Sequence, residues 1–196
     1  GRYLTCLVSK LKIWEKLSDR AQISRSFNSL GNLHRLASDL PRAREFYQQA
    51  LDIQKELGLE QFAATNLNNI GIIHWLQYNF AEAESFFREA LSIQERLNVP
   101  VEVARVLNNL GVISFVQGRL DKSAEYFARA ARLNAEAGAR AEELFNRLNQ
   151  VEVVLESGDL RTVVTRGQQV YDACREIGEY STAAEVSALL ADAFFR

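Results

Sequence analysis

The sequence predicts an all-α protein, an α-α superhelix in which about ten antiparallel helices form a solenoid. The first observation is a short motif that recurs every 40 residues, at residues 28–31, 68–71 and 108–111. The second is that other positions recur at the same interval without gaps. They include a small or left-handed position (Gly58, Asn98, Gly138 and Gly178) and an aromatic position (Tyr47, Phe87 and Phe127). Self-similarity at a fixed period of this size is typical of stacked helical hairpins.

The N-terminal segment, residues 1–17, is predicted to be one helix because Leu4, Leu7, Leu11, Trp14 and Leu17 recur at helical spacing. In the repeat register, this helix corresponds to the second helix of a hairpin. The first helix of that hairpin is missing, and the sequence starts without Met. We therefore expect the sequence to be a fragment of a longer protein.

The first complete repeat is expected at residues 22–57, with a break between its two helices near Asp39 and Pro41. Asp39 is predicted to cap the second helix, since Asp accepts hydrogen bonds from free backbone N–H groups and Pro is tolerated in the first turn. Gly58 is predicted to end this helix in the left-handed conformation.

Three further repeats are expected at residues 63–97, 102–137 and 142–177, followed by one helix at residues 181–196. All of these elements are assigned to a single domain, residues 1–196. The repeat at 142–177 is degenerate, with valine at three small positions and glycine, Gly167, at the aromatic position. We expect Val151 to face Gly167 there, with Tyr171 moving into the gap.

Three glycines, Gly31, Gly71 and Gly111, lie in the middle of predicted helices, where glycine costs about 1 kcal/mol relative to alanine. Small residues recur in the second helices, at Ala43, Ala83 and Ser123. The pattern indicates that the two backbones of each hairpin approach closely at these positions. The recurring aromatic residue is expected to fill the space beside the contact.

This arrangement of small and large positions resembles the tetratricopeptide repeat. The matching positions are Leu30, Gly31, Ala43, Tyr47 and Ala50; Ile70, Gly71, Ala83, Phe87 and Ala90; and Leu110, Gly111, Phe127 and Ala130. The period is longer than is usual in that family and is similar to the variety found in kinesin light chain and in bacterial regulators and sensor proteins. The resemblance implies that the first helices line a concave groove where a peptide is held.

Composition and motifs argue against several other classes of protein. The net charge is -2, so the basic surface typical of nucleic-acid binding is absent. No nucleotide-binding loop, nucleophile elbow or zinc motif is present, so we expect no enzyme activity and no cofactor. The two histidines, His34 and His74, occupy equivalent positions and are expected to pack between helices rather than bind metal. No apolar run is long enough to span a membrane, and the distant cysteines Cys6 and Cys174 favour a reducing, cytoplasmic location.

The first helices carry the candidate binding residues, which share one predicted helix face. Asparagine suits a peptide groove because its amide both donates and accepts hydrogen bonds, and aromatic and arginine residues often dominate binding energy. We expect a protein or an extended peptide to contact Arg25, Asn28, Arg35, Asn68, Asn69, Ile72, Trp75, Arg105, Asn108, Asn109, Val112, Phe115 and Asn149. The arginines favour an acidic ligand segment, whereas Glu152, Glu156, Glu185 and Asp192 favour a basic one.

Several alternatives remain open at this point. The asparagines could bond to one another as a structural ladder, and Trp75 and Phe115 could pack against neighbouring helices or form a pocket that senses a small molecule. The apolar segments 1–17 and 181–196 could instead join chains into a homo-oligomer or dock a regulatory domain. Recognition of RNA by helical repeats is a further alternative, which the acidic composition disfavours.

Overall fold

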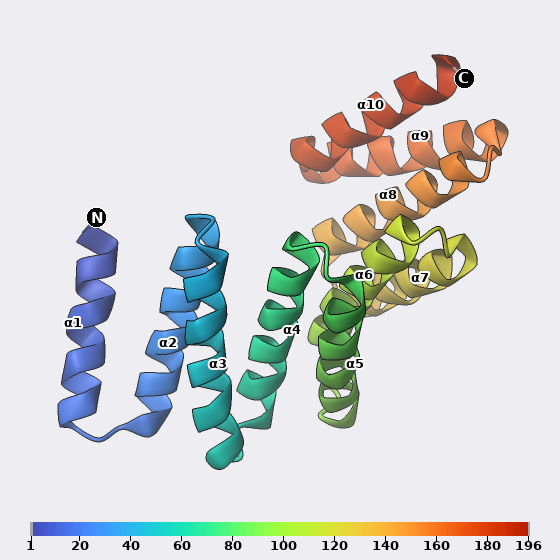
Figure 1. Cartoon of the computed structure of the whole chain (residues 1–196). Coiled ribbons are helices and arrows are strands. Elements are labelled where there is room, and N and C mark those ends of the chain that lie inside the picture. The colour runs from blue at the N-terminus through green and yellow to red at the C-terminus, as the bar shows by residue number, and fades with distance from the viewer. Residues whose placement is uncertain (1, 196) are drawn as a thin grey trace. The chain divides into compact units, whose positions relative to one another are not determined.

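The computed structural model describes the backbone of residues 2–195 and the side chains of residues 4–195, so Gly1 and Arg196 of the predicted terminal helices lie outside the described residues. Within that range all regular structure is helical, which confirms the all-α prediction (Figure 1). The helices are α1 (Arg2–Lys16), α2 (Arg20–Leu36), α3 (Leu40–Glu56), α4 (Glu60–Leu76), α5 (Phe80–Arg96), α6 (Pro100–Val116), α7 (Leu120–Glu136), α8 (Arg140–Glu156), α9 (Leu160–Ile177) and α10 (Tyr180–Phe195).

The helices group into two compact units, Gly1–Asn98 with α1 to α5 and Val99–Arg196 with α6 to α10. In the first unit the hairpins α2–α3 and α4–α5 pack internally, and α3 packs on α4. In the second unit α6–α7, α8–α9 and α9–α10 pack in the same consecutive manner, and α8 also contacts α10 (Figure 1). Each unit is therefore a stack of antiparallel helical hairpins. The assignment of residues 1–196 to one domain stays a prediction.

Each connection between helices contains one residue with a positive φ angle. The predicted left-handed positions have this conformation, with φ of 67° at Gly58 and 53° at Asn98. The turns inside the hairpins also use it, and there it falls on Ser38 and Tyr78 as well as on glycine. Because a single left-handed residue ends a helix and reverses the chain, consecutive helices within each unit are held close and antiparallel.

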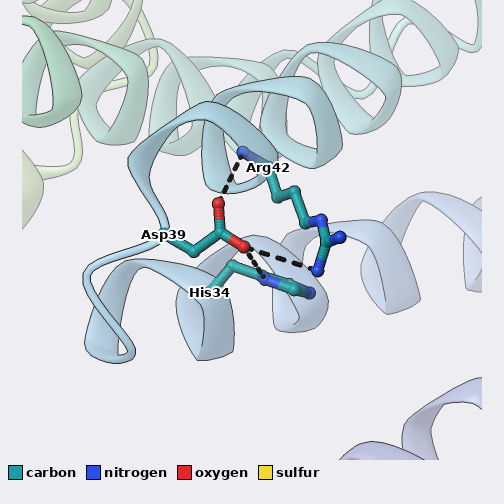
Figure 2. Close-up of polar contacts among 3 residues, drawn as sticks. All are labelled: His34, Asp39 and Arg42. Atoms are coloured by element: carbon teal, nitrogen blue, oxygen red, sulfur yellow. Dashed lines mark hydrogen bonds and ion pairs between the residues drawn. The ribbon is translucent and has the colours of Figure 1, made fainter.

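The predicted cap at Asp39 is confirmed. Its Oδ1 accepts a hydrogen bond from the backbone N–H of Arg42 at 3.4 Å, and its Oδ2 lies 3.2 Å from Nδ1 of His34 and 3.6 Å from the Arg42 guanidinium group (Figure 2). One carboxylate therefore caps α3 and ties the end of α2 to the start of α3. Asp159 caps α9 in the equivalent position, but Asn79 makes no side-chain cap bond at α5.

The mid-helix glycines are required chiefly by aromatic rings. A Cβ atom placed on Gly31, Gly71 or Gly111 would come within 2.6 Å of the ring of Tyr47, Phe87 or Phe127, respectively. The helices do approach closely, since the Ser123 hydroxyl donates to the backbone oxygen of Gly111 at 2.9 Å. The sequence interpretation is corrected in one respect: the ring lies directly on the glycine rather than beside the contact.

The degenerate fourth repeat packs differently from the expectation. A Cβ atom on Gly167 would meet Leu190 of α10 at 2.7 Å, and all three of its nearest atoms belong to Leu190. Leu190, and not Tyr171 as expected, therefore fills the space at Gly167, and the pairing of Gly167 with Val151 stays a prediction. Gly167 stands at the position of the ring in the other repeats, and the side chain of Leu190 from the following helix fills the space. Val151, Val163 and Val170 are buried in the same core cluster, with Tyr171 packed against it.

Both histidines pack between the helices of a hairpin, as expected. The His34 ring lies 5.3 Å from the Phe46 ring, and the His74 ring lies 5.2 Å from the Phe86 ring. In the part of the chain that the structure describes, no three His, Cys, Asp or Glu side chains are grouped for a metal ion. None of the helices in residues 2–195 combines the length and apolar character that spanning a lipid bilayer requires.

Candidate functional site

We call α2, α4, α6, α8 and α10 the A helices, because each is the first helix of a predicted repeat. The side of these helices that carries the predicted binding residues is called the A-helix face. The two units are described separately.

In the first unit, the A-helix face contains a network of side-chain amides. Asn28 donates to Oδ1 of Asn66 at 3.3 Å and accepts from the amide of Asn32 at 3.0 Å. Asn32 in turn accepts from the Tyr47 hydroxyl at 2.8 Å, and Asn66 donates to Oε1 of Gln54 at 2.7 Å. The network links α2, α3 and α4. Asn28 therefore joins helices, which is the structural role left open by the sequence.

The other predicted residues of the first unit differ in their exposure. Asn68 is only 5% exposed, whereas the neighbouring Asn69, together with Ile72 and Trp75, is half-buried and partly accessible. The guanidinium group of Arg25 in α2 lies 5.0 Å from the centre of the Phe62 ring, which belongs to the neighbouring A helix, α4. Arg35 is half-buried, and its Nε has no hydrogen-bond partner among the described residues.

In the second unit, a different pair of amides joins the A helices. Asn149 of α8 donates to Oδ1 of Asn108 of α6 at 2.8 Å. Arg105 forms an ion pair with Glu102 at 3.0 Å, so part of the positive charge expected to attract an acidic ligand is balanced within the protein. Asn109, which is engaged within the protein, is half-buried, as are Val112 and Phe115.

The four acidic residues singled out by the repeat register converge in the second unit. Glu152 and Glu156 of α8, and Glu185 and Asp192 of α10, line a cavity of about 480 Å³ together with Phe115, Leu155, Ala188 and Leu189. Burial and the neighbouring Glu185 carboxylate raise the pKa of Glu152. This is the response expected when carboxylates are held close together on a partly apolar surface.

A second cavity, of about 370 Å³, was not anticipated from the sequence. It lies among α6, α7, α8 and the start of α10, and its lining includes Asn134 and Asn146. These asparagines are 4% and 3% exposed, and Oδ1 of Asn146 is buried without a hydrogen-bond partner among the described residues. One feature of the sequence could have pointed to this cavity. The repeat position occupied by Gln54 and Gln94 holds the shorter asparagine at position 134.

The comparisons with known proteins support the repeat architecture. Two family models, each described as tetratricopeptide repeat, match residues 28–96 and 104–137, which together make up slightly more than half of the chain. The chain belongs to the tetratricopeptide repeat family. The predicted resemblance is therefore confirmed. No curated protein sequence matches this tetratricopeptide repeat chain.

Solved structures share the tetratricopeptide repeat fold. BtubC (BKLC) from P. vanneervenii is 26% identical, with a TM-score of 0.72 over 80% of this chain and 65% of that one. A STAND protein with a tetratricopeptide repeat sensor from Pyrococcus horikoshii is 16% identical, with a TM-score of 0.82 over 94% of this chain and 29% of that one. The Rap conjugation gene regulator of plasmid pLS20, solved with the Phr* peptide, is 17% identical, with a TM-score of 0.71 over 92% and 53%. The chain thus spans less than two thirds of each of these proteins.

Proposed function

We propose that this chain is a non-catalytic scaffold that binds a protein or an extended peptide along the A-helix face, as one module of a larger regulatory or signalling protein. The observation that carries the proposal is the cavity in the second unit that combines Phe115 with four carboxylates. Support also comes from the similar fold of the Rap regulator, which was solved with a bound peptide. The ligand segment at this cavity is basic.

A lysine or arginine side chain matches the cavity in both shape and charge. Its methylene groups can lie against Phe115 and Leu189 while its charged end approaches Glu152 and Glu185. Burial raises the pKa of Glu152, and repulsion from the nearby Glu185 carboxylate raises it further. A bound cation relieves this repulsion, which favours binding of a basic side chain.

The remaining predicted residues divide into two roles under this proposal. The buried or bonded amides of Asn28, Asn68, Asn108 and Asn149 hold neighbouring helices in register. The partly accessible side chains Asn69, Ile72, Trp75, Asn109 and Val112 contact the ligand. The charges of Arg25, Arg35 and Arg105 contribute less to binding than the acidic cavity, since two of them have partners within the protein.

Fluorescence anisotropy with labelled peptides tests this function. The probes are two alanine- and leucine-containing peptides of equal length, one with lysines and one with glutamates at the same positions. We expect the lysine peptide to bind more tightly, and Glu152→Gln with Glu185→Gln to weaken its binding by about tenfold or more. Glu125→Gln, an exposed carboxyl on α7, is the matched control. Equal binding of both peptides, or full binding by the double variant, contradicts the proposal.

Self-association is the second candidate function, favoured by exposed apolar residues on α1 and α10. Phe194 and Phe195 are 74% and 92% exposed, and Ile13 and Leu17 are also exposed. Large exposed apolar side chains often mark protein contacts. Light scattering over a concentration series separates the two functions, because a peptide receptor stays monomeric whereas a self-associating chain increases in mass. Phe194→Ser with Phe195→Ser abolishes association under this alternative.

A further inference from the structure

Two equivalent pairs of amides in the two units have different partners. In the first unit, Gln54 of α3 and Asn66 of α4 are both buried, and the Asn66 amide donates to Oε1 of Gln54 at 2.7 Å. Oδ1 of Asn66 also accepts from Asn28 at 3.3 Å. The buried Asn66 amide is therefore satisfied on both its donor and acceptor sides, as is usual for buried polar groups.

Two repeats later, the same positions are Asn134 of α7 and Asn146 of α8. Asn134 is one methylene group shorter than Gln54, and no hydrogen bond joins it to Asn146 among the described residues. The second contact is also changed, because Asn108, the counterpart of Asn28, accepts from Asn149 instead. Oδ1 of Asn146 is consequently left buried and unpartnered.

The cavity of about 370 Å³ lies at this place, and both asparagines line it. Val101, Ala104 and Phe145 supply apolar walls. The charged side chains of the lining include Arg105 and Glu142, which are exposed, and Arg105 is already paired with Glu102. Apolar walls with a few convergent polar groups are typical of ligand pockets. Because Oδ1 of Asn146 is buried without a partner in this cavity, it favours a ligand group that donates a hydrogen bond.

We propose that this cavity is a subsite for a carboxamide, the side chain of a glutamine or asparagine residue in a bound peptide. This inference rests on the proposed peptide-binding function and adds a specificity determinant to it. The ligand carboxamide donates to Oδ1 of Asn146 and accepts from the amide of Asn134. Its N–H group takes the place of the Asn28 amide, which donates to Oδ1 of Asn66 in the first unit. A charged group is disfavoured, because transfer of an unpaired charge into such a site costs far more than transfer of an amide.

The test uses two small probes and NMR detection of the side-chain amide resonances of Asn134 and Asn146. N-acetyl-glutaminamide carries the carboxamide, and N-acetyl-norleucinamide has the same backbone amides with an apolar side chain. We expect the glutamine probe to shift both resonances in a saturable manner and to bind about tenfold or more tightly than the norleucine probe. Equal shifts from both probes, or none from the glutamine probe, overturn the proposal.

Asn134→Gln is the decisive variant, because it restores the side chain found at Gln54. We expect it to raise the melting temperature, because the amide of the longer side chain reaches Asn146. We also expect it to weaken binding of the glutamine probe by about tenfold or more. Gln54→Asn, the reverse change in the first unit, is the matched control and leaves binding of this probe unchanged. Asn146→Leu provides a second variant that removes the unpartnered amide, and we expect it to abolish binding of the probe.

The outcomes distinguish this subsite from the proposed function. If the lysine peptide binds and depends on Glu152 and Glu185 but the glutamine probe does not shift the two asparagines, the subsite alone is wrong. If the probe binds but neither lysine nor glutamate peptide does, the proposed peptide function is wrong while the cavity remains an amide site. Unchanged probe affinity in folded Asn134→Gln overturns the subsite in either case.

Discussion

The ring of Phe87 occupies the space that a side chain on Gly71 would need. A Cβ atom at Gly71 would lie 2.6 Å from Cε1 of Phe87, closer than two carbon atoms can approach without movement. Both residues are buried, so the ring has little room to shift. The helix therefore keeps glycine at a position where alanine would favour helix formation.

We predict that Gly71→Ala lowers the free energy of unfolding by about 1–3 kcal/mol, because overpacking outweighs the gain in helix propensity. Gly167→Ala is the matched control. Its new Cβ atom meets only the side chain of Leu190, which is half-buried and can rotate. Chemical denaturation of both variants checks this, and an unaltered or more stable Gly71→Ala would show that the ring adapts.

The amide network of the first unit leads to a second prediction. Asn66→Ala leaves Oε1 of Gln54 buried without its donor, which lowers the free energy of unfolding by about 1–3 kcal/mol. Asn146→Ala removes an amide from the equivalent position of the second unit, where Oδ1 has no partner. Asn146→Ala should therefore lower the free energy of unfolding by much less than Asn66→Ala. Thermal melting of the two variants measures the difference, and equal losses would mean that the network contributes nothing to stability.

The third prediction concerns the acidic cavity. Burial and Glu185 raise the pKa of Glu152 in the folded chain, so its protonated form is favoured there. This difference in pKa contributes to the free energy of unfolding. The contribution is fully present below the carboxyl pKa of the unfolded chain, and it is lost as the pH rises through the raised pKa of the folded chain. Glu152→Gln should therefore stabilise the chain at neutral pH by up to about 1 kcal/mol.

Urea denaturation at about pH 7 and about pH 4 checks this third prediction, since the advantage of Glu152→Gln must shrink at the lower pH. Glu136→Gln, an exposed carboxyl on α7, serves as the control for general charge effects. A gain that is the same at both pH values would show that the effect does not come from titration of Glu152.

The capping carboxylate in Figure 2 suggests a fourth prediction. In the hairpin α4–α5, Asn79 takes the place of Asp39, and Nδ1 of His74 is buried without a partner among the described residues. Burial, followed by Arg44, lowers the pKa of His74, although Glu82 opposes this. Asn79→Asp should place a carboxylate beside His74, as Asp39 lies beside His34, and should raise the His74 pKa.

An NMR titration of the imidazole protons measures the His74 pKa directly. Asn79→Asp should also stabilise the first unit by about 0.3–1 kcal/mol, because an anion is favoured at the start of α5. Asn79→Ala controls for the loss of the asparagine itself. If the His74 pKa does not rise in Asn79→Asp, the geometry around Asp39 does not carry over to this hairpin.

Some features of the site could be read from the register of the repeat. Glu152, Glu156, Glu185 and Asp192 were expected on one face, and the structure brings them into a single cavity. Equivalent positions in stacked hairpins face the same direction, so a regular spacing is enough to group them. The same reasoning could not tell whether Asn28 or Asn108 faces a ligand, because their hydrogen-bond partners lie on other helices.

The sequence by itself determined the helices, their turns and the cap at Asp39, because these depend on side-chain patterns and on backbone conformations that are local to a few residues. Only the tertiary structure decided that Phe87 lies on Gly71, that Leu190 fills the space at Gly167, and that Asn146 lacks a partner. These outcomes depend on the length and direction of side chains from different helices, where a single methylene group between Gln54 and Asn134 separates a bonded pair from an open cavity.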